Sequence, residues 1–135
     1  MTSEKSFKIF VAHTWEYSES YYRVSRYLNE ISGFKHENTG NMDLWSSVGA
    51  KPPKEALLKQ MVPAEIVIVN SEVFKRDIEG LVSYIMDEAE SCGKPIIGID
   101  SWGPQLISPL INAKAKEIIP WDPLKMVEAI RRYGA

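Results

Sequence analysis

The sequence predicts an α/β fold in which a parallel sheet lies between two layers of helices. Strand-like apolar segments alternate five times with helical segments along 135 residues, with no internal repeat and no linker. The two clearest strands, Glu65–Asn70 (EIVIVN) and Pro95–Ile99 (PIIGI), are continuously apolar, as is typical of strands covered on both faces. We therefore expect helices on both faces of the sheet.

The individual elements follow from spacing and from helix boundaries. The expected strands are Lys8–Ala12, Phe34–Asn38, Glu65–Asn70, Pro95–Ile99 and Glu117–Ile119. The expected helices are Ser18–Ile31, Lys54–Met61, one from Ile78 to just before Gly93, one near Pro104–Ala113, and one from Asp122 to Arg132. Right-handed crossovers favour the strand order 2-1-3-4-5, so the prediction is a flavodoxin-like three-layer sandwich.

The composition indicates one globular domain spanning residues 1–135. The chain is 44% hydrophobic and 25% charged, with a net charge of −2, and its lysines are scattered, so we expect no nucleic-acid partner. Apolar stretches fall short of the roughly 20 residues of a membrane span, so we expect no membrane partner. The N-terminus is unlike a signal peptide and the single cysteine, Cys92, allows no internal disulfide, so we expect a cytoplasmic protein. The residue spacing indicates neither a metal site nor a Gly-rich phosphate loop.

Polar and aromatic residues follow three of the expected strands. In a sheet of this order, ligands bind outside the carboxyl ends of the strands, where the order reverses between the first and third strands. Two tryptophans at that edge could stack on a flat ring such as a purine or nicotinamide. The candidate binding residues are His13, Thr14, Trp15, Asn70, Ser71 and Trp102.

Each candidate also has a structural explanation. His13 could be a turn residue whose hydrogen bonds are satisfied. Trp15 and Trp102 could cover the core. Asn70 and Ser71 could cap the helix that follows the third strand.

Five stretches together resemble a known family. They are KIFVAHTWEYSESYYR, FKHENTGNMDL, LLKQMVPAEIVIVNSEVF, GKPIIGIDSWG and EIIPWDPLKMVEAIR, and they run from Lys8 to about Arg132. In these stretches the chain resembles the TIR-like family that includes the Thoeris antiphage defence proteins and small archaeal flavodoxin-fold members.

The resemblance implies a nucleotide ligand and a role in defence. TIR enzymes cleave NAD to nicotinamide and an ADP-ribose-derived signal, so NAD would be a substrate or ligand rather than a tightly bound cofactor. The implied partners are NAD or an ADP-ribose-type nucleotide, further TIR copies through self-assembly, or a defence effector protein. The long irregular segment Thr39–Pro53 would help to frame the nucleotide site.

The resemblance also points to the position of the catalytic glutamate, which Ile85 occupies here. From its helical neighbours, Ile85 should be largely buried. Asp77 and Glu88 are the alternative acids, although the helix dipole is enough to explain Asp77, and Glu88 fits a solvated helix face. Two hypotheses follow. One is a TIR-type NAD glycohydrolase or cyclase with a displaced carboxylate, and the other is a catalytically silent module that binds a nucleotide or a protein partner.

Overall fold

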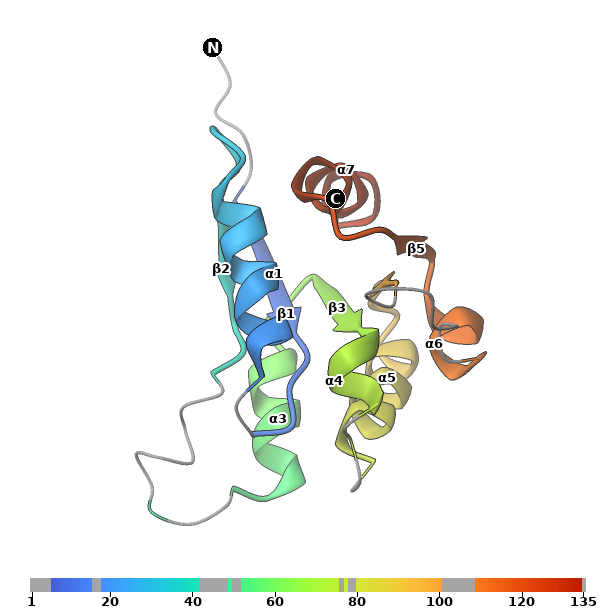
Figure 1. Cartoon of the computed structure of the whole chain (residues 1–135). Helices are drawn as coiled ribbons and strands as arrows, with labels where there is room; N and C mark the ends of the chain where they lie inside the picture. The colour runs from blue at the N-terminus through green and yellow to red at the C-terminus, as the bar shows by residue number, and fades with distance from the viewer. Residues whose placement is uncertain are drawn as a thin grey trace.

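A computed structural model describes residues 6–15, 18–41, 49, 52–75, 77, 80–100 and 109–134. These residues form an α/β fold around a five-stranded, all-parallel sheet of order β2-β1-β3-β4-β5 (Figure 1). The predicted flavodoxin-like order is confirmed. Trp102 and most of Thr39–Pro53 lie outside the described residues.

The strands are short and lie where the sequence predicts them. Their bounds are β1 Phe7–Val11, β2 His36–Asn38, β3 Ile66–Asn70, β4 Ile96–Ile99 and β5 Glu117–Ile119. Every residue of β3 and β4 is buried, as their continuous apolar character predicts.

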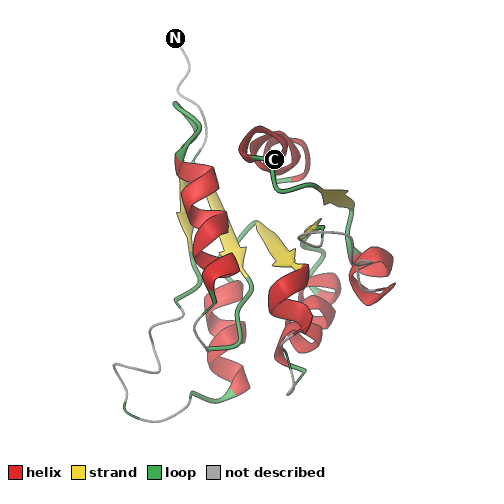
Figure 2. Cartoon of the chain, in the orientation of Figure 1, coloured by secondary structure: helices red, strands yellow, loops and turns green. Residues whose placement is uncertain are grey.

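Along the chain, each strand is followed by a helix before the next strand begins (Figure 2). Their bounds are α1 Glu19–Asn29, α3 Lys54–Met61, α4 Ser71–Lys75, α5 Leu81–Ser91, α6 Pro109–Lys114 and α7 Pro123–Tyr133. Helix α1 packs against α7, and α3 packs against α5. The sequence did not predict α4, a short helix that begins directly where β3 ends.

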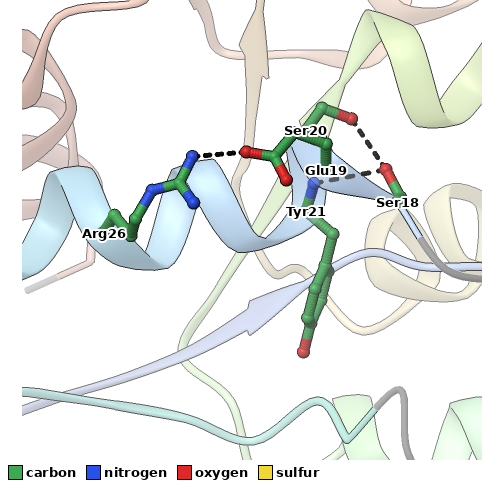
Figure 3. Close-up of polar contacts among 5 residues, drawn as sticks. All are labelled: Ser18, Glu19, Ser20, Tyr21 and Arg26. Atoms are coloured by element: carbon green, nitrogen blue, oxygen red, sulfur yellow. Dashed lines mark hydrogen bonds and ion pairs between the residues drawn. The ribbon is translucent and has the colours of Figure 1, made fainter.

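Helix α1 begins where a capping serine precedes an amphipathic stretch. The Ser18 hydroxyl accepts a hydrogen bond from the Tyr21 amide at 3.3 Å and lies 2.8 Å from the Ser20 hydroxyl (Figure 3). Arg26 donates to the Glu19 carboxylate at 2.6 Å on the exposed side, where an ion pair adds little stability. The aromatic ring of Tyr21 points away from this polar group and is buried.

Helix α5 covers β3 and β4 with a fully apolar face. Its buried residues are Leu81, Val82, Ile85, Met86 and Ala89, and Ile85 is only 1% exposed, as predicted. The close approach of β4 to its neighbours depends on Gly98. A Cβ there would lie 2.6 Å from the Ile118 side chain and 2.7 Å from that of Ile111.

Candidate functional site

The edge between β1 and β3 is the point where the strand order reverses. The chain leaves β1 toward β2 on one side and reaches β3 on the other. Val11 lies opposite Ile68, so continuing this register brings His13 level with Asn70. The structure therefore brings the predicted residues after β1 and at the end of β3 to one edge. They are buried, except for the half-buried Thr14.

His13 is a buried core residue with both ring nitrogens engaged. Its Nε2 lies 2.9 Å from the Gln60 Oε1, and its Nδ1 accepts a hydrogen bond from the Trp15 amide at 3.2 Å. Phe10, Trp15 and Tyr21 surround the imidazole, with ring centroids 4.6–5.8 Å away. His13 thus fits the description of a satisfied turn residue, and its contacts give it a role in holding the local chain.

Trp15 has a backbone conformation that bulky residues rarely adopt. Its φ angle is 73°, in the left-handed region, which costs free energy for a residue with a Cβ. The side chain is 3% exposed, and its buried indole Nε1 has no hydrogen-bond partner within the described part of the chain. A buried donor without an acceptor is destabilising by about 1–3 kcal/mol. Strain and an unused donor therefore coincide at the end of β1.

Asn70 and Thr39 repeat this feature at the ends of the two neighbouring strands. The Asn70 Oδ1 accepts from the Val73 amide at 2.9 Å and so caps α4, which was the structural explanation for this residue. Its buried Nδ2 and the buried Thr39 hydroxyl oxygen have no hydrogen-bond partner among the described residues. A buried donor without a partner in the described part of the chain thus lies at the end of β3 and just after each of β1 and β2.

Ser71 has a structural contact instead. Its hydroxyl donates to the Ile99 carbonyl at 2.9 Å and ties the end of β3 to the end of β4. Because that proton is committed to a carbonyl, Ser71 cannot also donate it to a ligand. We therefore assign Ser71 to the framework of the edge.

The two alternative acids, Asp77 and Glu88, lie just before the start of α5 and within it. Asp77 accepts from the Leu81 amide at 2.9 Å with one carboxylate oxygen and from the Val82 amide at 2.7 Å with the other. It therefore caps α5, as the helix-dipole explanation predicts. Glu88 is half-buried on α5. Burial raises the pKa of Tyr84, and the negative charges of Glu88 and Glu55 add to this shift.

Sequence patterns did not identify two residues of this site, Asn38 and Gln60. The Asn38 Oδ1 accepts from the Val11 amide at 3.2 Å and from the Gly40 amide at 2.9 Å, so it joins β1 to the turn after β2. Its Nδ2 donates to the Tyr21 hydroxyl at 3.0 Å. An asparagine followed by Thr-Gly is a turn signal that could have identified Asn38. A lone helical glutamine gives no such signal.

A separate cavity of about 120 Å³ lies at the opposite, amino edge of the sheet. Two of its three lysines have structural partners: Lys94 donates to the Val62 and Ala64 carbonyls, and Lys114 lies 3.0 Å from both Asp87 and Glu90. The hydrogen bonds to Glu90 and Asp87 raise the pKa of Lys114. Lys94 and Lys114 thus serve mainly to hold the surrounding helices in place.

The described residues carry neither a metal-ligand cluster nor a helix suited to a membrane. They contain no group of three or more His, Cys, Asp or Glu side chains arranged to hold a metal ion. No helix among them is long and apolar enough to cross a bilayer.

No protein-family model matches the chain, and no curated protein matches it. Its class therefore follows from the fold. It is an α/β protein with a flavodoxin-like parallel sheet, and in such proteins ligand sites lie at the carboxyl edge where the strand order reverses.

Proposed function

We propose that this chain is a catalytically silent TIR-like module that binds NAD or an ADP-ribose-type nucleotide at the edge between β1 and β3. One observation carries the proposal. Three buried donors, the Trp15 Nε1, the Thr39 hydroxyl and the Asn70 Nδ2, end neighbouring strands without a partner in the described chain. A ligand rich in acceptor oxygens would satisfy them.

The ribose and diphosphate groups of such a nucleotide provide these acceptors. A hydrogen bond from a neutral donor to a charged oxygen contributes about 1.5–3 kcal/mol, more than a bond between neutral groups. The strained Trp15 main chain adds support, since strain of this kind clusters at ligand-binding positions. The free protein would then be locally destabilised by the Trp15 strain and the unpaired donors, and ligand binding would offset this free energy.

Catalytic silence is supported by the surroundings of the acids. Loss of nicotinamide develops positive charge on the ribose, which a nearby carboxylate must stabilise. The position that the TIR resemblance implies for that carboxylate is the buried, apolar Ile85, and both oxygens of Asp77 are committed to the start of α5. In a Thoeris-type defence system, the module would sense the nucleotide signal and pass it on by self-assembly or to an effector protein.

Calorimetric titration with NAD and with ADP-ribose tests the proposal. Asn70→Ser keeps a side-chain oxygen for the cap of α4 and removes the unpaired Nδ2, so its affinity should fall about tenfold. Asp122→Ser is the matched control. It changes the cap of α7, where the Asp122 carboxylate accepts from the Lys125 amide after β5, two strands away from β3, and should leave affinity unchanged.

Two results would contradict the proposal. One is the absence of binding of either nucleotide at millimolar concentration. The other is nicotinamide release by the unmodified chain at high protein concentration. If Asp77→Asn or Glu88→Gln abolished that release, the chain would be an enzyme with a displaced carboxylate.

A further inference from the structure

Gln60, on α3, contacts both the end of β1 and the chain that follows β2. Its Oε1 accepts from the Asn41 amide at 2.9 Å, and its Nε2 donates to the Asn41 carbonyl at 3.1 Å. A backbone N–H can only donate and a backbone carbonyl can only accept, so this pair of bonds fixes which end of the Gln60 amide is oxygen. The oxygen end is therefore the one that lies 2.9 Å from His13.

The orientation of Gln60 in turn fixes the protonation state of His13. Because it faces an oxygen, the His13 Nε2 must carry a proton and donate it. Because the Trp15 amide donates to the His13 Nδ1, that nitrogen must be unprotonated. The two contacts together define the neutral imidazole with its proton on Nε2. Such a histidine is uncharged and both of its ring nitrogens are engaged within the fold, so its role is to hold geometry.

The chain of contacts ends at the strained Trp15. The bond from its amide to His13 holds the main chain where the φ angle is 73°, and the two rings pack edge to face at 4.6 Å. Asn41, Gln60, His13 and Trp15 therefore form one continuous hydrogen-bonded path between two loops that are far apart in sequence. The bonds that Gln60 makes to His13 and Asn41 are 2.9–3.1 Å long. The indole Nε1 of Trp15, at the other end of the path, has no hydrogen-bond partner among the described residues.

We propose that Gln60 is the positioning residue of this site, and that through the neutral Nε2–H form of His13 it couples ligand contact at the Trp15 indole to the main chain at Asn41. The coupling rests on the proposed nucleotide site, whereas the protonation state of His13 does not. When a ligand oxygen accepts from the indole, the Trp15 main chain loses freedom. That restraint passes through His13 and Gln60 to the Asn41 amide.

Two NMR measurements on the full chain test the proposal. The ¹⁵N shifts of the His13 ring in the free protein should report a protonated Nε2 and an unprotonated Nδ1. Hydrogen exchange of the Asn41 amide should slow further, about threefold or more, when ADP-ribose saturates the protein. An imidazolium or a proton on Nδ1 at neutral pH would overturn the proposal, as would an Asn41 amide unaffected by bound ADP-ribose.

Three variants separate positioning from simple packing. Gln60→Met removes every hydrogen bond of the side chain at similar length, so the slowing at Asn41 should vanish and affinity should fall about tenfold. His13→Asn keeps an acceptor for the Trp15 amide in an Asx turn but does not reach Gln60, so it should bind ADP-ribose and lose the response at Asn41. Lys59→Met, an exposed neighbour on α3, is the control and should behave like the unmodified chain.

The outcomes distinguish the two proposals. A folded Gln60→Met variant with an unchanged response at Asn41 and unchanged affinity would remove Gln60 from the role. If ADP-ribose does not bind the unmodified chain, the proposed function and the coupling both fail. The His13 ring shifts and the faster exchange of Asn41 in the free Gln60→Met variant then still decide whether Gln60 holds the two loops.

Discussion

Ile85→Glu is the most informative single substitution, because it restores the residue that the TIR resemblance implies. Ile85 is 1% exposed on the apolar face of α5, between Leu81, Val82 and Ala89. Losing its burial costs about 1.5–3 kcal/mol, and an unpaired buried carboxylate adds several kcal/mol more. A small domain has only about 5–15 kcal/mol of stability in total. We therefore expect a sharp fall in melting temperature and no NAD cleavage.

The matched variant Ile85→Gln isolates the charge, since glutamine has the same shape and no carboxylate. Burial raises the pKa of the new carboxyl in the folded state, so the unfolded state loses its proton first. Below the ordinary carboxyl range both states are protonated, and the two variants should be equally stable. As the pH rises above that range, the glutamate variant should lose about 1.4 kcal/mol per pH unit relative to glutamine, until the folded state also ionises.

Urea denaturation of both variants at several pH values measures this difference. Equal stability of the glutamate and glutamine variants at neutral pH would show that the carboxylate at position 85 is not buried. Nicotinamide release by a stable Ile85→Glu protein would go further. It would show that residue 85 faces the bound nucleotide and that a carboxylate at this one position is enough to restore catalysis.

Three further predictions concern the core, the edge and the pH response. Gly98→Ala should lower the free energy of unfolding by about 1–3 kcal/mol, because the new methyl meets Ile111, and a change under 0.5 kcal/mol in urea denaturation would contradict this packing. Thr39→Val removes an unpaired hydroxyl at constant shape, so the free energy of unfolding should stay equal or rise by up to about 1 kcal/mol, and ADP-ribose binding should weaken. A clear loss of stability would mean that the hydroxyl is hydrogen-bonded in the folded protein. Burial lowers the pKa of His36, which stacks on Phe34 at 5.3 Å. Its contribution is therefore present above the ordinary histidine pKa and lost as the pH falls through the folded-state pKa, and His36→Gln should flatten the stability profile between about pH 7 and pH 5.

The sheet could be predicted because its signals are local and strong. Continuous apolar runs such as Ile66–Asn70 identify buried parallel strands, and alternation with helices leaves few topologies. Element boundaries were less predictable. The helix expected from Ile78 has its first described turn at Leu81, because Gly80 adopts a left-handed φ of 75° and Asp77 caps the helix from outside. Apolar spacing carries no information on such a cap.

The position of the site could be predicted, but its internal contacts could not. Topology alone brings His13 and Asn70 to one edge. Whether a polar side chain there faces a ligand or bonds to its own chain depends on partners distant in sequence. Gln60 is 47 residues from His13, and a neutral amide in a helix has no pattern that marks it. The pairing appears only once α3 packs beside the end of β1.

Ligand contact at the edge between β1 and β3 can be read directly from the indole N–H signal of Trp15 during a titration with ADP-ribose. The chain has four tryptophans, and comparison with Trp15→Phe assigns the relevant indole peak in a ¹H–¹⁵N spectrum. This peak should shift and saturate with the ligand, because the buried Nε1 gains an acceptor. A Trp15 peak that stays in place, while ADP-ribose binds elsewhere or not at all, would contradict a nucleotide site between β1 and β3.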